Sequence, residues 1–329
     1  MTSLRATLKS ATALAAFTLS FPMASWAEEP IPVVATFSIL GDMVKRIGGE
    51  HIALTTLVGP DGDTHVYQPT PKAARSVAEA DVLFLNGLDF EGWLERLAEA
   101  ASFDGTMVVA TNGVVPIAFD DHDDHDDEKH DDHDDRDDHD DHDDHADHAG
   151  HDHGAFDPHA WQSLENAVIY VNNIAAGLAQ ADPENAGDYY TNRAAFVAEV
   201  EVLKSEVDAM MKNLPSDKRT VVTAHDAFGY FGATYDLTFV APQGIGTDSE
   251  VSAGDLAALI TQIREESISA VFIESLTDNR MIEQIANETG ATIGGMLYAG
   301  ALSAQSGPAS NYLDMMRHNA TTLFEALGN

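Results

Sequence analysis

The sequence predicts an α/β protein of two lobes, each with a mostly parallel sheet flanked by helices, and a long rigid helix that joins them. Short apolar runs alternate with longer helical patterns from Pro30 onward, as in a parallel sheet with crossover helices. A long amphipathic stretch interrupts this alternation, which then repeats through the second half of the chain. A chain of 329 residues is long enough for two domains of ordinary size.

Residues 1–27 are predicted to be a cleaved secretory signal peptide. Arg5 and Lys9 precede a short apolar run, and Ser25 and Ala27 have the small-x-small spacing of a signal-peptidase site. The run is shorter than the roughly 20 apolar residues that a transmembrane helix requires. The sequence contains no Cys, so we expect neither disulfides, nor thiolate metal ligands, nor a lipidated N-terminal cysteine. An exported protein, free in a periplasm, is therefore expected.

Residues 28–180 are predicted to form the N-terminal lobe and residues 216–329 the C-terminal lobe. Each lobe should contain four strands with helices between them. The strands expected in the first lobe are 32–37, 53–58, 82–86 and 107–110, with helices over 38–49 and 71–80. Those expected in the second lobe are 220–224, 237–241, 270–274 and 292–297, with helices over 255–267 and 279–290.

Residues 181–215 are predicted to form the linking helix. Asp182 is expected to cap its start and Pro183 to occupy its first position. Apolar residues then recur every three or four positions: Phe196, Val200, Leu203, Val207, Met210 and Leu214. One helix of about 30 residues would be about 45 Å long, enough to contact both lobes. Such a strut should limit relative motion of the lobes.

The stretch 120–154 is rich in aspartate and histidine and has no apolar periodicity. We expect a disordered insertion in the first lobe, because so polar a segment cannot offset the entropy of ordering. The formal net charge of -38 disfavours nucleic acid and anionic lipid as partners and attracts cations. The insertion is predicted to bind metal weakly, or else to be a plain solvated charge run. Its histidines are His122, His125, His130, His133, His139, His142, His145, His148, His151 and His153.

Three histidines outside this stretch lie in contexts typical of ligand sites. His65 lies in GPDGDTHVYQPTP after one apolar run, and His225 lies in TVVTAHDAFGYF after another. Open α/β sheets bind ligands beyond the carboxyl ends of their strands. His159 lies in FDPHAW, next to a proline and close to a tryptophan. His51 and His318 are expected to be surface residues.

A single histidine at a strand end is usually a hydrogen-bonded structural residue. Three together, in an acidic exported protein, indicate a metal centre. Neutral imidazole is a common zinc ligand, and three imidazoles leave a fourth tetrahedral position open. These residues alone leave open a Zn2+ carrier or a hydrolase that uses a zinc-bound water.

Four motifs resemble the zinc and manganese solute-binding proteins of ABC importers, over nearly all of the mature chain. GDTHVYQPTP is similar to the first-ligand loop of that family, DPHAW to the second, HDAFGYF to the third and SGPASNYLDMMRHN to the C-terminal helix signature. The resemblance implies that His65, His159 and His225 bind a metal ion between the lobes. Histidine at position 225, where the manganese proteins commonly have glutamate, favours zinc.

The resemblance implies a monomeric periplasmic protein, not an enzyme, that captures Zn2+ and delivers it to a membrane permease. The ATPase must be a separate chain, because the sequence has no Walker motif. A periplasmic metallochaperone is a second candidate partner, and the insertion would serve as an accessory zinc collector. The alternatives are a zinc buffer or storage protein, a manganese carrier, and a three-histidine zinc hydrolase.

One position departs from the family pattern. The segment LYAGALSA places Gly300 where the family usually supplies an aspartate ligand. Water, Glu274 or a residue of the insertion such as His151 or His153 would then complete the site. Water is preferred, because capture of the insertion would require ordering a flexible segment. Asp226 is expected either to orient an imidazole or to cap the following helix.

Overall fold

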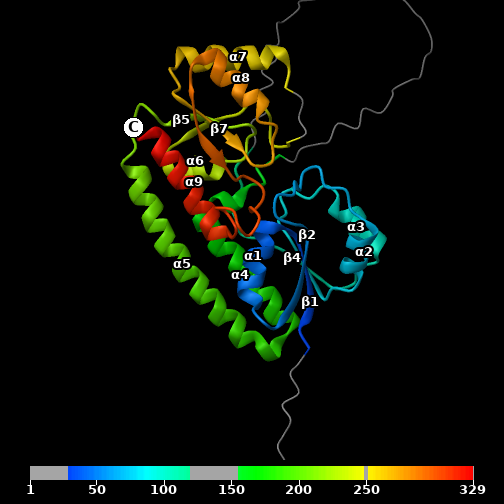
Figure 1. Ribbon diagram of the computed structural model, residues 1–329. Helices are drawn as coiled ribbons and strands as arrows, with labels where there is room; N and C mark the ends of the chain where they lie inside the picture. The colour runs from blue at the N-terminus through cyan, green and yellow to red at the C-terminus, as the bar shows by residue number, and fades with distance from the viewer. Residues whose placement is uncertain (1–28, 119–154, 248–250, 329) are drawn as a thin grey trace, which may run out of the picture.

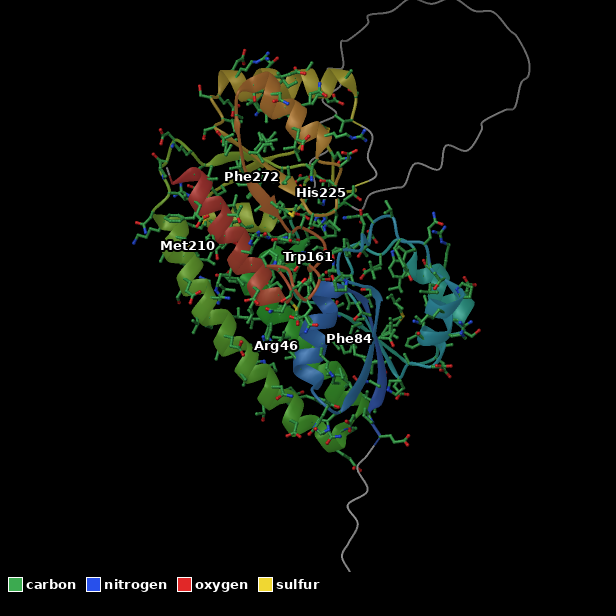
Figure 2. All side chains as sticks on the ribbon, in the orientation of Figure 1. Arg46, Phe84, Trp161, Met210, His225 and Phe272 are labelled. Carbon is green, nitrogen blue, oxygen red and sulfur yellow. The ribbon has the colours of Figure 1, made fainter. Side chains whose placement is uncertain are left out.

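The computed structural model describes residues 29–118, 155–247 and 251–328. Two lobes of similar construction are present, as predicted (Figure 1). Phe84 and Phe272, both fully buried, lie in the N-terminal and C-terminal lobes respectively (Figure 2). The predicted signal peptide and the histidine-rich insertion lie outside the described residues. Within those residues, no helix combines the length and apolar composition that a membrane span requires.

The N-terminal lobe is built on a parallel sheet in the order β2-β1-β3-β4. Its apolar runs are nearly continuous because helices cover both faces, and residues 33–37 of the first strand are all buried. The strands are β1 (Ile31–Phe37), β2 (Ile52–Val58), β3 (Val82–Leu85) and β4 (Thr106–Val109). The helices are α1 (Ser38–Gly48), α2 (Pro71–Ala78), α3 (Leu94–Ala101) and α4 (Leu164–Ala181).

The C-terminal lobe repeats this topology, with a parallel sheet in the order β6-β5-β7-β8. The strands are β5 (Thr220–Val222), β6 (Thr238–Val240), β7 (Ala270–Glu274) and β8 (Thr292–Leu297). The helices are α6 (Gly229–Tyr235), α7 (Ala253–Glu265), α8 (Arg280–Thr289) and α9 (Tyr312–Leu327). In both lobes the first two strands of the sequence lie side by side, which places corresponding loops at corresponding edges.

The long helix α5 (Ala186–Lys212) links the lobes and packs against α1 and α4 of one and α6 and α9 of the other (Figure 1). Its buried stripe contains the predicted residues from Phe196 to Val207, but it begins earlier, at Tyr189, and continues through Met211 rather than Met210. Asp182 caps a short 3-10 turn, η2 (Pro183–Asn185), and the α-helix itself begins only after that turn. A helix of 27 residues is about 40 Å long.

Glu91 is a buried carboxyl group of the N-terminal lobe, with 7% of its surface exposed. Burial raises its pKa to about 7, although hydrogen bonds from Thr36 and from the backbone of Asn86 and Gly87 act to lower it. This pKa affects the stability of the fold.

The free energy of unfolding should fall as the pH rises from about 4.5 to about 7. In this range the unfolded chain has lost the Glu91 proton and the folded chain retains it, so low pH favours the folded state. The difference between the pKa values of Glu91 in the unfolded and folded chains lowers the free energy of unfolding by about 3 kcal/mol. This loss is complete near neutral pH. Urea unfolding of the wild type and of Glu91→Gln over this range measures the effect. A stability difference between the two proteins that did not change with pH would contradict it.

Candidate metal centre

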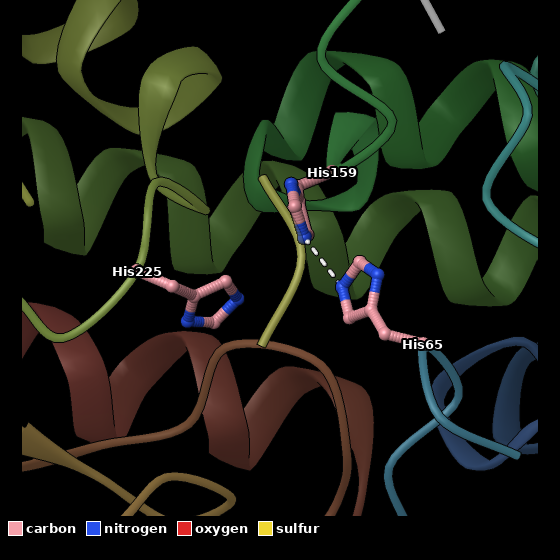
Figure 3. A group of neighbouring side chains, drawn as sticks. All are labelled: His65, His159 and His225. Carbon is pink, nitrogen blue, oxygen red and sulfur yellow. Dashed lines mark hydrogen bonds between the residues drawn. The ribbon is translucent and has the colours of Figure 1, made fainter. Parts of the chain in front are cut away.

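The structure brings His65, His159 and His225 together (Figure 3), and His225 lies at the boundary between the lobes (Figure 2). His65 lies in the loop after β2, and His225 follows β5 of the other lobe. His159 immediately precedes a short 3-10 helix, η1 (Ala160–Gln162). His159 and His225 are almost fully buried, whereas His65 is partly exposed. The site thus lies beyond the carboxyl ends of strands from both sheets, as expected for α/β folds.

The spacing of the three imidazoles fits one metal ion. One nitrogen from each ring can be chosen so that all three lie within 4.8 Å of one another. The Nε2 atoms of His65 and His159 are 3.3 Å apart. Two nitrogens bound at about 2.0–2.1 Å to one tetrahedral zinc ion are also about 3.3 Å apart. Nε2 of His225 is buried and has no hydrogen-bond partner among the described residues, which leaves its lone pair available.

Asp157 orients the imidazole of His159. Its Oδ1 atom lies 2.8 Å from both the backbone nitrogen and Nδ1 of His159. A carboxylate in this position keeps the proton on Nδ1, so Nε2 presents a lone pair to the centre. Metal-bound histidines usually have such a partner on their second nitrogen.

Glu274, at the end of β7, holds His225 in the same way. Its Oε1 atom accepts hydrogen bonds from the backbone N–H groups of Ala224 and His225, at 2.7 and 3.0 Å. Its Oε2 atom lies 2.5 Å from Nδ1 of His225. Both oxygens therefore have partners away from Nε2 of His225. Among the described residues, Glu274 does not belong to the group of atoms spaced to hold one ion.

Asp63 connects the His65 loop to the C-terminal lobe. The backbone N–H of His65 donates to its Oδ1 atom at 2.9 Å, and the hydroxyl of Thr247 donates to its Oδ2 atom at 2.6 Å. Asp63 and Asp157 both precede a histidine by two residues and both accept the N–H of that histidine. The same local turn thus shapes the chain at two of the three histidines.

The electrostatic environment favours a cation. Burial acts to lower the pKa of His225, but the charges of Glu274, Asp63 and Asp226 more than offset this, and the pKa is raised. Burial also raises the pKa of Asp226, and the negative charge of Asp157 raises it further, whereas the two buried histidines act to lower it. Several carboxyl groups therefore lie close to His225, and a bound cation would offset their mutual repulsion.

The remaining candidate residues lie elsewhere or have other roles. His51 contacts Asp188 at 2.9 Å, and His318 lies 3.0 Å from the carbonyl oxygen of Met296, so neither reaches the centre. Asp226 hydrogen-bonds neither His159 nor His225 within the described chain. It also caps no helix, because α6 begins at Gly229 with Phe228 at the capping position. The ten histidines of the insertion lie outside the described residues.

Gly300 lies in the buried loop after β8. A Cβ atom there would find Leu276 as its nearest neighbour at 3.5 Å, which is ordinary contact. The loop therefore has room for a Cβ atom at Gly300.

Sequence reasoning missed Asp63 and Asp157. The signal was present, because GDTH and DPH share an aspartate two residues before the histidine. Asp and Asn side chains commonly bond the backbone two residues on. The orienting role of Glu274 had no such local signal, since it comes from a different strand.

The chain is similar to known metal-binding proteins over most of its length. A family model described as "Zinc-uptake complex component A periplasmic" matches residues 33–326. The manganese-binding lipoprotein MntA of Halalkalibacterium halodurans is 28% identical over 300 residues, which cover 91% of this chain and 89% of that protein. The iron-binding protein YfeA of Yersinia pestis is 28% identical over 296 residues, which cover 90% and 86%.

A solved structure has the same fold. The periplasmic zinc binding protein TroA of Treponema pallidum matches with a TM-score of 0.78 at 24% sequence identity. The match covers 92% of this chain and 100% of that chain. The two lobes and the long linking helix are therefore shared with a metal-binding protein.

Proposed function

Since the chain belongs to the zinc-uptake complex component A family, the metal-binding solute-binding proteins of ABC importers, we propose that it captures Zn2+ between its lobes for import. Members of this family are solute-binding proteins and not enzymes, which removes the alternative of a three-histidine zinc hydrolase. The single observation that carries the proposal is the convergence of His65, His159 and His225, whose ring nitrogens, one from each ring, lie within 4.8 Å of one another.

The choice of zinc rests on the donor atoms. The relatives are named for manganese or iron, so membership of the family leaves the metal open. Imidazole nitrogen suits zinc, whereas carboxylate and carbonyl oxygens suit manganese. In the described chain the three candidate ligands are all imidazoles. Water is the proposed fourth ligand, because Gly300 offers no side chain and both oxygens of Glu274 have other partners.

The proposed pathway begins with export. Residues 1–27 direct the chain to the periplasm and are removed, and the monomer is not lipidated, because the sequence contains no Cys. The insertion at 120–154 binds further zinc ions weakly and concentrates metal near the three-histidine centre. The loaded protein delivers its ion to a membrane permease that works with a separate ATPase chain. A periplasmic metallochaperone is proposed as a second partner.

Replacing His159 by Ala should weaken zinc binding at the tight site by about 100-fold or more, because the ion loses a buried ligand held by Asp157. Competitive titration against a chromogenic chelator measures the affinity, and His51→Ala is the matched control.

In the wild type, Mn2+ should compete poorly with Zn2+ at this site. Unchanged zinc affinity in His159→Ala, or preference for Mn2+ in the wild type, would contradict the proposal. A zinc buffer predicts instead that His65→Ala has little effect on zinc-limited growth.

Deleting residues 120–154 should leave one tight zinc site and abolish weaker binding. Residues 120–154 offer many aspartate and histidine side chains, and we expect them to bind zinc more weakly than the centre formed by His65, His159 and His225. Counting bound zinc ions in the full and deleted chains by the same titration tests this. If the deletion removed tight binding, the insertion would have to supply the fourth ligand.

Replacing Glu274 by Gln should weaken zinc binding by about 10- to 100-fold with little change in shape. A Gln side-chain NH2 group beside Nδ1 of His225 would donate a hydrogen bond to it, which places the imidazole proton on Nε2, where the metal should bind. Isothermal titration of the purified variant with Zn2+ measures the loss. Wild-type affinity in Glu274→Gln would show that this carboxylate does not set the tautomer.

A further inference from the structure

The turn Asn86–Glu91, between β3 and α3, has an unusual backbone. Gly87, Leu88 and Asp89 have φ values of 89°, 54° and 59°, so three consecutive residues are in the left-handed region. Glycine adopts this conformation readily, but leucine and aspartate do so at a cost. Strained backbone of this kind persists only where surrounding contacts hold it, and it is frequent near functional sites.

The carboxyl group of Glu91 supplies the contacts that hold this turn. Its Oε1 atom accepts the backbone N–H of Asn86 at 2.7 Å and the hydroxyl of Thr36 at 2.6 Å. Its Oε2 atom accepts the backbone N–H of Gly87 at 3.2 Å. On its other side the turn lines a groove of about 860 Å3 with Leu94, Phe103 and Met107. Packing is therefore incomplete on that side, and the buried hydrogen bonds hold the turn.

The turn contacts two of the three candidate ligands, His65 and His159. The ring of Phe90 lies edge-on to His65, with ring centres 5.0 Å apart, and to His159 at 6.0 Å. The side chain of Asn86 donates to the carbonyl oxygen of Pro158, the residue before His159, at 2.9 Å.

A further contact lies at the start of α3. The indole of Trp93 donates to the carbonyl oxygen of Thr64, the residue before His65, at 3.0 Å. The turn and its neighbour thus contact the two histidines and the residue before each of them.

We propose that Glu91 and Phe90 are positioning residues of the metal centre, which set the distance between His65 and His159 before the ion arrives. This inference rests on the proposed function, because the positioned rings must bind the transported metal. Glu91 acts through the turn and touches neither imidazole, whereas Phe90 fills the space behind both rings. If Glu91 and Phe90 only filled space in the core, the backbone of the turn would not affect the distance between His65 and His159.

Zinc release from the full chain tests the proposal in Glu91→Gln and Phe90→Leu. Both changes approximately preserve volume; the first places an amide NH2 against the N–H of Gly87, and the second removes the ring edge from the two imidazoles. Zinc dissociation into excess chelator should be about tenfold faster in each variant. With Co2+ as a probe, the visible absorption bands should weaken and shift, which loss of stability alone would not cause.

Asp182→Asn is the matched control. Asp182 is also a buried carboxylate that accepts hydrogen bonds, from Tyr189 and Asn185, and it forms none of the contacts of the metal centre. The Asp182→Asn substitution should lower the melting temperature without changing zinc release or the Co2+ spectrum. If Glu91→Gln does not fold, Phe90→Leu carries the test.

Wild-type zinc release and a wild-type Co2+ spectrum in the folded variants would overturn the positioning role while leaving the proposed function intact. A wild-type chain that retained no zinc against the chelator would overturn both.

Discussion

The position of the candidate metal centre depends on one short segment, Asp157–Gln162, which is hydrogen-bonded to both lobes. On one side its Pro158 carbonyl accepts the side chain of Asn86. On the other side the side chains of Trp161 and Gln162 both donate to the carbonyl oxygen of Ala299, in the loop after β8. His159 is thereby fixed between a histidine of the N-terminal lobe and a histidine of the C-terminal lobe. Because these groups are buried, breaking any of these bonds would leave a polar atom unpaired at a substantial cost.

Much of this architecture follows from the sequence, because local pattern determines it. The strands over 270–274 and 292–297 have their predicted bounds, and the loops after β2 and β5 contain His65 and His225 as predicted. Helix α4 was not predicted, since it is apolar on several faces and packs against α1, α5 and β4. The roles of Glu274 and Glu91 were also inaccessible, because their partners come from distant parts of the chain and no local pattern encodes such contacts.

In the proposed metal centre, the buried carboxyl groups would help neutral imidazole ligands to attract a dication. Asp157 and Glu274 lie behind His159 and His225, where they fix the tautomers and add negative charge close to the site. Asp226 lies near both histidines without a hydrogen bond to either, and burial raises its pKa. Such groups repel one another in a metal-free centre. A bound dication offsets that repulsion, so the same charges that destabilise the empty site favour its occupation.

Rigidity constrains how such a centre can hold and release its ion. Helix α5 packs against both lobes, and the backbone N–H of Asp61 donates across the boundary to the carbonyl oxygen of Leu302. The N–H of Leu302 in turn donates to the hydroxyl of Ser38. A wide hinge opening would break these bonds together. In the proposed site, retention of the ion would therefore depend on the number, charge and preorganisation of the ligands, and Gly300 would contribute no anionic ligand.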